Sequence, residues 1–297
     1  MIELGPRVAA ALRAGQPVVA LESTIVAHGL PRPDNLRVAR EVEAAVRAAG
    51  AEPATIGMIE GRVVVGLDDG QLQHLATDLS VVKLSARDLA PASVAGRDGA
   101  TTVAATAVIA AQAGIRVFAT GGLGGVHRSV AGEFPFDESA DLAALARAPI
   151  VVVCAGVKSI LDVAATLERL ETLGVTVLGY RTTRFPGFYL RDAGFDLDWS
   201  VQTPAEAAAV LRAQIGDAAV VVANPLPADQ QLDPARHEEI LAAALAGAAR
   251  DTVTGKAATP YLLAHFHQAT AGASLTVNIR IILRNADLAA RIAVELG

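Results

Sequence analysis

The fold class follows from the stretch Ile150-Val151-Val152-Val153-Cys154-Ala155-Gly156-Val157-Lys158-Ser159. Its first half is a continuous apolar run, which predicts a strand buried on both faces of a sheet. Short β-branched runs of this kind alternate along the chain with longer Ala/Leu segments at helical spacing, a pattern typical of a parallel sheet covered by helices. Strands are predicted at residues 18–21, 55–59, 63–67, 81–84, 116–119, 151–155, 175–178 and 220–223.

Turn and capping signals complete the predicted fold. Glu60-Gly61 lies between two apolar runs and predicts an antiparallel hairpin, so the sheet is expected to be mixed. Thr203-Pro204-Ala205-Glu206 combines a capping box with a first-turn proline, and residues 261–289 are expected to be mostly helical. The sequence has no Gly/Ser-rich linker and no internal repeat. We therefore expect a single α/β domain over residues 1–297, with a mixed, mostly parallel central sheet flanked by helices in an α/β/α arrangement.

Composition limits the classes of partner. The chain has 297 residues, 52% of them apolar, and a formal net charge of -6, which argues against nucleic-acid binding. No apolar run reaches the roughly 18 residues that a bilayer crossing needs, and Glu3 is an early acid that does not suit an export signal. Cys154 is the only cysteine, which suits a reducing compartment, and its expected role is that of a small buried strand residue. We expect a cytoplasmic protein that acts on a small molecule.

Polar residues follow several of the predicted strands. Because ligands bind beyond the carboxyl ends of strands in open α/β sheets, Glu22, Lys83 and Lys158 are expected to share one rim. Lys158 lies beside a glycine at the expected start of a helix, where it is either an amine nucleophile or a lysine that snorkels to solvent. Lys83 either anchors a phosphate or pairs with Glu22. Glu22 is either a proton donor whose pKa is raised by burial or a carboxylate paired with an arginine.

Three further segments carry candidate ligands. The glycines of Gly121-Gly122-Leu123-Gly124-Gly125 allow a backbone to approach an anion, as does Gly99-Ala100-Thr101-Thr102, which is expected to open an Ala-rich helix. Neither matches a P-loop or a dinucleotide signature, so each is equally well read as a structural turn. Phe136-Asp137-Glu138-Ser139-Ala140-Asp141 offers oxygen ligands for a hard cation, although Ser139 or Asp137 is more often a plain helix cap. His28 is expected in a loop with Gly29.

With these residues described, the chain resembles the pseudouridine-5'-phosphate glycosidase family, also known from indigoidine biosynthesis clusters. The resemblance runs nearly end to end and rests on ordered blocks: Ala20-Leu21-Glu22-Ser23-Thr24-Ile25 with His28-Gly29, Val82-Lys83-Leu84-Ser85-Ala86-Arg87-Asp88-Leu89, Gly99-Ala100-Thr101-Thr102-Val103, Ala119-Thr120-Gly121-Gly122-Leu123-Gly124-Gly125-Val126-His127, Phe136-Asp137-Glu138-Ser139-Ala140-Asp141-Leu142, Cys154-Ala155-Gly156-Val157-Lys158-Ser159 and Val277-Asn278-Ile279.

The resemblance implies a reversible reaction in which pseudouridine 5'-phosphate and water give ribose 5-phosphate and uracil through a covalent lysine adduct. It implies that Lys158 is the Schiff-base nucleophile, that Glu22 is the proton donor and that Asp137 binds a divalent metal, Mn²⁺ in the first place and Mg²⁺ or another ion otherwise. It also implies a homotrimer. The substrate contacts that it implies, together with the glycine-rich turns, are Lys83, Thr101, Thr102, Val103, Thr120, Gly121, Ser139, Ala140, Asp141 and Asn278.

Two features and two alternatives stay open at this point. The stretch 129–135 is longer than the family pattern, and residues 181–186 have the composition of a loop that covers a substrate but no assigned role. The same lysine-bearing rim would also serve an aldolase or lyase acting on another sugar phosphate. A non-catalytic sugar-phosphate sensor, in which Lys158 and Lys83 merely bind the anion, is the other alternative.

Overall fold

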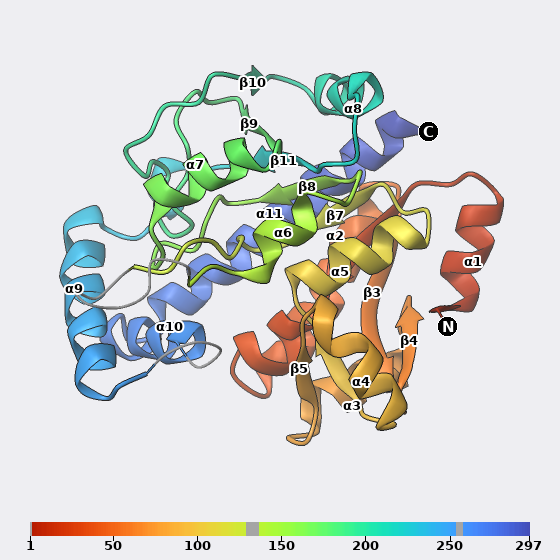
Figure 1. The fold of residues 1–297 in the computed structure, drawn as a ribbon, viewed down its shortest axis with the longest axis horizontal. Coiled ribbons are helices and arrows are strands. Elements are labelled where there is room, and N and C mark those ends of the chain that lie inside the picture. The colour runs from red at the N-terminus through yellow and green to blue at the C-terminus, as the bar shows by residue number, and fades with distance from the viewer. Residues whose placement is uncertain (1, 129–136, 254–257) are drawn as a thin grey trace.

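The protein was studied as a computed structural model that describes residues 2–128, 137–253 and 258–297 (Figure 1). Within these ranges one sheet of eleven strands forms the centre, with the strand order β1-β4-β3-β2-β7-β8-β11-β9-β10 and with β5 and β6 beside β3. The strands are β1 (Ile2–Leu4), β2 (Val18–Glu22), β3 (Glu52–Ile59), β4 (Arg62–Val65), β5 (Val82–Leu84), β6 (Gly99–Thr101), β7 (Val117–Ala119), β8 (Val151–Cys154), β9 (Thr176–Tyr180), β10 (Ser200–Val201) and β11 (Val220–Ala223).

Helices cover both faces of this sheet (Figure 1). The π-helix η1 (Ile25–Gly29) follows β2 directly, and short 3-10 turns lie at 86–88 and 228–230. The α-helices are α1 (Pro6–Arg13), α2 (Asp34–Ala48), α3 (Asp69–Thr77), α4 (Leu89–Val94), α5 (Val103–Gln112), α6 (Ala140–Leu145), α7 (Val163–Thr172), α8 (Pro204–Ala213), α9 (Pro234–Arg250), α10 (Ala258–Ala269) and α11 (Ala273–Leu296). None of the helices in the described ranges is long and apolar enough to cross a membrane.

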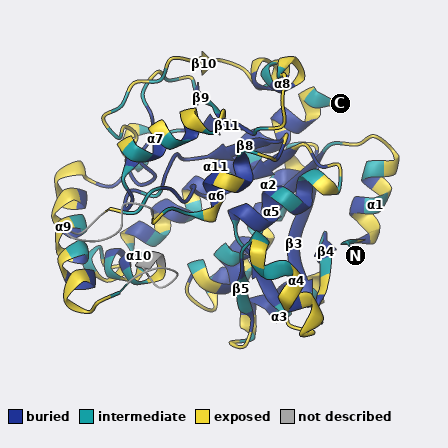
Figure 2. Cartoon of the chain, in the orientation of Figure 1, coloured by how far each residue is buried: buried dark blue, intermediate teal, exposed yellow. Residues whose placement is uncertain are grey.

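Alternate strand residues face opposite layers, as the period of a β-strand requires. In β8, Val152 and Cys154 belong to the core that contains residues of α1, α5, α6 and α7, whereas Val151 and Val153 belong to the core beneath α2, α8 and α11. Both sets are fully buried, which is why the central strands and the middle of α11 are dark blue in Figure 2. The predicted α/β class with a mixed, mostly parallel central sheet between helices is confirmed. Cys154 is buried in its strand, as expected.

The predicted hairpin is confirmed, but three short strands, β1, β6 and β10, were not expected. Strands β3 and β4 pair in antiparallel register from Ile56 opposite Val65 to Ile59 opposite Arg62, with a turn at Glu60-Gly61. Of the segment 99–102 that was expected to open a helix, residues 99–101 form strand β6 and only Thr102 is at the start of the helix. A Cβ added at Gly99 would lie 2.2 Å from the Leu84 side chain, so glycine serves here to bring β6 against β5. Helix α5 begins only at Val103, with the Thr102 hydroxyl accepting the Ala105 amide.

Helix ends agree closely with the predicted signals. The Thr203 hydroxyl accepts the Glu206 amide at 3.2 Å and caps α8, which has Pro204 in its first turn. The Glu206 carboxylate accepts the amide of Gln202 rather than that of Thr203, so only half of the expected capping box forms. The C-terminal region is helical as expected, in two pieces, because Gly272 adopts a left-handed conformation between α10 and α11.

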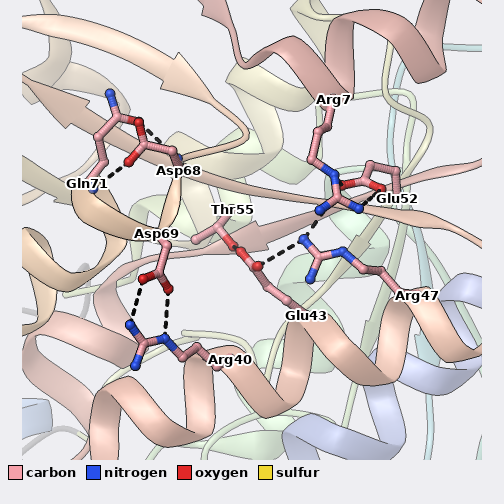
Figure 3. A network of polar contacts seen from close by, with 9 residues as sticks. All are labelled: Arg7, Arg40, Glu43, Arg47, Glu52, Thr55, Asp68, Asp69 and Gln71. Carbon is pink, nitrogen blue, oxygen red and sulfur yellow. Dashed lines mark hydrogen bonds and ion pairs between the residues drawn. The ribbon is translucent and has the colours of Figure 1, made fainter.

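A chain of ionic contacts holds α2 against the edge of the sheet (Figure 3). The Thr55 hydroxyl of β3 donates to Glu43 of α2 at 2.6 Å, and Arg47 lies 3.2 Å from the same carboxylate and 3.6 Å from Glu52. Arg7 of α1 pairs with Glu52 at 3.1 Å. Because most exposed ion pairs contribute little to stability, the buried Thr55 hydroxyl is the contact here that fixes the position of α2.

Candidate active site

The candidate site lies where two strands meet end to end. β2 pairs in parallel with β3 up to Glu22 opposite Ile56, while β6 pairs in antiparallel with the next residues of β3. The carboxyl ends of β2 and β6 therefore point toward each other at Ile56. Its carbonyl accepts hydrogen bonds from the Ser23 hydroxyl at 2.6 Å and the Thr101 hydroxyl at 2.7 Å. Lys83 thus reaches the site from a strand that runs opposite to β2, so the expected single rim of parallel strands is replaced by two opposed strand ends.

A chamber of about 380 Å³ opens over this junction and is called the main chamber below. Its wall carries cationic and anionic side chains side by side. The residues that line it include Glu22, Thr24, Lys83, Ser85, Arg87, Thr102, Val103, His127, Asp137, Ser139, Ala140, Asp141 and Lys158.

A smaller chamber of about 80 Å³, called the side chamber below, shares Glu22, Thr24, Lys83 and Lys158 with the main chamber. The remainder of its wall is largely apolar, with one histidine and one amide, and consists of Ile25, His28, Gly29, Gly121, Gly122, Phe188, Pro260, Leu263 and Asn278. The carboxylate and the two lysines singled out from the sequence therefore lie together at the boundary between a chamber lined by many charged side chains and one with a largely apolar wall.

Glu22 closes β2 with its carboxylate at this boundary. The Thr120 hydroxyl donates to its Oε1 at 2.5 Å. A void of about 20 Å³ with a mainly apolar wall lies behind it and is too small for a substrate. Burial raises the pKa of Glu22 above its ordinary value, against the opposing effects of the Lys158 charge and the Thr120 hydrogen bond. The raised pKa expected from the sequence is therefore supported, and no arginine pairs with this carboxylate in the described ranges.

Lys158 lies in the loop between β8 and α7, half-buried, and its Nζ donates to the carbonyl of Gly122 at 2.8 Å. The expectation that it begins a helix is wrong, because α7 begins at Val163 with Asp162 as its cap. The macrodipole of α7 acts only within its own first turn, so it does not act on this amine. Lys158 does not snorkel to bulk solvent, because it lines both chambers and is the charge that acts most strongly on Glu22.

The glycines at 121–125 allow other segments of the protein to pack closely against this loop. A Cβ at Gly122 would lie 2.6 Å from the ring of Phe188, and one at Gly124 would lie 2.3 Å from the Ser139 hydroxyl. The anion that its backbone meets is a side chain of the protein, since the Gly124 amide donates to Asp141 at 2.8 Å. The other oxygen of Asp141 accepts the Ala104 amide of α5 at 3.0 Å. Asp141 therefore ties the glycine loop to α5 and lines the main chamber as well.

The three threonines expected to contact substrate have different places. Thr101 is fully buried and lines neither chamber, because its hydroxyl donates to Ile56 and accepts from Thr106. Its position therefore gives no support for a substrate contact through the hydroxyl. Thr120 is also fully buried and acts on Glu22. Thr102 lines the main chamber beside Val103 at the start of α5.

The segment around Asp137 meets the main chamber from the opposite wall. Ser139 caps α6 by accepting the Asp141 amide at 3.2 Å, so the plain capping role weighed from the sequence is present. Asp137 is 56% exposed, and its Oδ1 lies 2.9 Å from Nδ1 of His127 without an aligned hydrogen bond. The long stretch 129–135 lies outside the described residues.

The donor set suits only one kind of metal ion. Among the described residues, no group of three or more His, Cys, Asp or Glu side chains could hold an ion by itself. This excludes an all-protein zinc cage within those ranges. A single accessible carboxylate suits a hard cation such as Mn²⁺ or Mg²⁺ that keeps most of its waters, and Asp137 meets that requirement.

Several site residues had no role assigned from the sequence. Arg87 and Ser85 line the main chamber, and the buried Ser85 hydroxyl has no partner among the described residues. His28 belongs to η1 rather than to a loop, and burial, Lys83 and Arg32 lower its pKa. Phe188 has a left-handed backbone with φ of 62°, which is costly for a bulky residue. In the sequence, the only indication that Ser85 and Arg87 belong to the site was the family-like block 82–89 around Lys83.

The side-chain amide of Asn278 is a further unpaired group. Asn278 lines the side chamber, is 7% exposed, and its Oδ1 has no hydrogen-bond partner among the described residues. Since a buried polar atom without a partner is costly, this amide is ready to bind a polar ligand group. The loop at 181–186 contributes indirectly, because the segment that it begins carries Phe188 to the chamber wall.

Comparison with known proteins places the chain in a family. Residues 7–295 match the family described as indigoidine synthase A like protein. A pseudouridine-5'-phosphate glycosidase of Salinispora tropica is 70% identical over 294 residues, which cover 98% of this chain and 90% of the relative. Another from Streptomyces griseus is 58% identical over 295 residues, with 98% and 91% covered.

Solved structures agree with these relatives. A prealnumycin C-glycosynthase in complex with ribulose 5-phosphate matches with a TM-score of 0.91 and 38% identity, covering 100% of this chain and 97% of the other. An indigoidine synthase A-like protein from Thermotoga maritima matches with a TM-score of 0.89 and 32% identity, covering 100% and 96%. The chain therefore belongs to the indigoidine synthase A like family, and it is an enzyme.

Proposed function

We propose that the protein reversibly cleaves the carbon–carbon glycosidic bond of pseudouridine 5'-phosphate, giving ribose 5-phosphate and uracil. One observation carries the proposal: Lys158 and Glu22 meet at the boundary between a chamber lined by many charged side chains and one with a largely apolar wall. A nucleophile and a proton donor are needed on either side of the bond that breaks, and the substrate itself has a polar sugar-phosphate half and a flat base. The names of the highly identical relatives support the same substrate.

The two halves of the substrate fit the two chambers. In the main chamber, Lys83, Arg87 and the amino end of α5 at Val103 provide charge and backbone donors for the phosphate. Ser139, Ala140 and Asp141 line the opposite side, along the sugar. In the side chamber, the aromatic ring of Phe188 offers a flat wall for uracil, and the unpaired Asn278 amide offers it hydrogen bonds.

An amine is needed because a carbon-linked base has no leaving heteroatom that an acid could simply protonate. The Lys158 nitrogen attacks the anomeric carbon while the bond to the ring oxygen breaks, and the proton that the attacking amine loses is taken up by that oxygen. Glu22, protonated because its pKa is raised, then delivers a proton to the uracil carbon. The nitrogen lone pair forms an iminium as the carbon–carbon bond breaks. Water hydrolyses the iminium, releasing ribose 5-phosphate and the free amine.

A divalent ion, Mn²⁺ in the first place, belongs to the proposal, with Asp137 as its protein ligand. Such an ion supplies positive charge that polarises sugar or phosphate oxygens when it is bound. His127 lies beside Asp137 at the same wall, with its Nδ1 2.9 Å from Oδ1 of that carboxylate. We also propose that the enzyme works in the cytoplasm as a homotrimer, in keeping with its single buried, reduced cysteine and with the family resemblance.

The proposal is tested by measuring uracil released from pseudouridine 5'-phosphate by chromatography, with Mn²⁺ present. We expect steady release by the native enzyme and none by Lys158→Ala. Lys158→Arg is the matched control, because it keeps the positive charge but cannot lose its proton. Turnover by Lys158→Arg at a near-native rate would contradict a nucleophilic lysine. Binding of ribose 5-phosphate without uracil release by the native enzyme would identify a sensor instead.

A second function is favoured by the solved C-glycosynthase in complex with ribulose 5-phosphate. The reverse direction of the proposed reaction also forms a carbon–carbon bond, so a different aromatic acceptor would make this chain a C-glycosynthase. The small size of the side chamber, about 80 Å³, favours a single ring such as uracil. Incubation of ribose 5-phosphate with uracil or with a larger phenolic acceptor separates the two. Fragmentation of the sugar phosphate in either mixture would point to a lysine-dependent aldolase or lyase.

A further inference from the structure

We propose that Asn285 is a positioning residue that holds Glu22 and Lys158 in their reactive arrangement from the opposite side of the glycine loop. The inference deepens the proposed function and rests on it. Asn285 lies in α11, is 1% exposed and lines neither chamber, so it cannot touch substrate directly. Its influence has to pass through the residues to which it donates hydrogen bonds.

The amide of Asn285 is held at both ends. Its Nδ2 donates to the carbonyl of Thr120 at 2.8 Å and to the carbonyl of Gly121 at 3.3 Å. Its Oδ1 accepts from Nδ2 of Asn224 at 3.0 Å. Because carbonyl oxygens only accept, the nitrogen of the Asn285 amide has to face the loop, and the orientation of the side chain is determined.

Asn224 is fixed as firmly as its partner. It follows the last residue of β11 and is 6% exposed, and its backbone N–H donates to the carbonyl of Cys154 at 2.8 Å. The pair therefore connects the ends of β8 and β11 with the end of β7 through side chains that are buried among apolar residues of α11. Buried polar side chains are costly unless their groups are paired, and here Asn224 donates to Asn285, which in turn donates to the loop.

Each carbonyl that Asn285 holds is linked to one catalytic side chain. Thr120, whose carbonyl accepts at 2.8 Å, donates its hydroxyl to Glu22 at 2.5 Å. Gly121 precedes Gly122, whose carbonyl accepts from Nζ of Lys158 at 2.8 Å. A rotation of the peptides at 120–122 would move the proton donor and the nucleophile together. Asn285 is the side chain that restrains those peptides from the α11 side.

The glycine loop needs this restraint because its own packing is one-sided. The Gly121 carbonyl also accepts the Ala155 amide at 2.9 Å, which ties the loop to the Lys158 segment. Phe188 packs on the Gly122 face with a strained backbone. On the α11 side, hydrogen bonds to Thr120 and Gly121 carbonyls come from Asn285 alone among the described residues. A loop without Cβ atoms rotates readily, so the loss of these donors is expected to loosen the catalytic arrangement.

The test compares Asn285→Leu, which has the same branched shape but no donor, with Leu288→Ala. Leu288 lies about one turn further along α11, is buried in the core beneath α2 and α8, and has no side-chain donor for the loop. We expect Asn285→Leu to lower kcat about tenfold, as the loss of hydrogen bonds in the reacting complex would, with KM changed by less than about twofold. Leu288→Ala is expected to lower Tm and leave kcat near the native value.

A double-mutant cycle with Asn224→Leu separates positioning from packing. If Asn224 acts only by orienting Asn285, the double variant has the kcat of Asn285→Leu alone. Should Asn285→Leu fail to fold, Asn285→Ala takes its place in the cycle. The inference is overturned if a folded Asn285 variant keeps the native kcat, or if Leu288→Ala loses as much kcat as Asn285→Leu does. It is also overturned if the fold-changes in kcat of the two single variants simply multiply in the double variant. An inactive native enzyme would instead refute the proposed function, so the two failures are distinguishable.

Discussion

The Thr120 hydroxyl controls the protonation of Glu22, and Thr120→Val removes it while keeping the shape of the side chain. The hydroxyl donates to the carboxylate at 2.5 Å, and Thr120 is fully buried, so water cannot readily replace it. A hydrogen bond to a charged group is worth about 1.5–3 kcal/mol, so its loss shifts the ionisation equilibrium about ten- to a hundredfold toward the neutral carboxyl.

The sign of the effect on catalysis follows from the role of Glu22 as a proton donor. If Glu22 donates its proton as proposed, kcat of the native enzyme is expected to fall as the pH rises through the pKa of Glu22, because the donor loses its proton. Burial already raises this pKa, and removal of the Thr120 hydrogen bond raises it further. Thr120→Val is therefore expected to keep its activity to a higher pH than the native enzyme. A decline at the same or a lower pH in the variant would refute the role assigned to Glu22.

Stability depends on the same ionisation. A carboxyl whose pKa is raised in the folded state contributes stability that is full below its unfolded pKa and is lost as the pH rises through its folded pKa. In Thr120→Val that loss is expected to extend to higher pH. Thr106→Val is the matched control, since its buried hydroxyl donates to Thr101 at 2.9 Å and has no bond to Glu22. We expect Thr106→Val to lower Tm without moving the pH profile of kcat.

Three further outcomes follow from the packing, the metal site and the thiol. Gly122→Ala places a Cβ 2.6 Å from the Phe188 ring and is expected to cost about 1–3 kcal/mol of unfolding free energy in urea, so unchanged stability would contradict the close packing. Removal of divalent ions with a chelator is expected to stop uracil release, with Mn²⁺ restoring it in the native enzyme and not in Asp137→Asn; full activity without any metal would count against Asp137 as a ligand. Burial raises the pKa of Cys154 to about 12, so iodoacetamide is expected to leave the native protein unlabelled, and rapid labelling by mass spectrometry would show the thiol to be accessible.

The sequence predicted the central strands well because each is a run of β-branched residues buried on both faces. The eight predicted strands are all present, with ends displaced by a few residues. β6 could not be predicted in the same way, because Gly99-Ala100-Thr101 has small side chains that occur equally at the start of a helix. Its direction depends on pairing with β3 at Gly57 and Met58, which is a tertiary contact.

The candidate site was predicted in part for the same reason. Glu22 and Lys158 follow apolar strands, so their convergence follows from the parallel β2 and β8. Lys83 arrives on an antiparallel element, which no local pattern indicates. Asn285 lies on the buried, mostly apolar face of α11, and nothing in the sequence around it indicates which loop its side chain contacts. The left-handed backbone of Phe188 is likewise fixed by its packing on Gly122 and not by its neighbours in sequence.

The most direct measurement is covalent trapping at the amine. The protein is incubated with ribose 5-phosphate, reduced with borohydride and digested, and its peptides are mapped by mass spectrometry. The account requires a reduced pentose phosphate attached to Lys158, and none when Lys158→Arg is treated in the same way. A native protein that turns over substrate yet carries no adduct, or carries it on Lys83, would contradict the account.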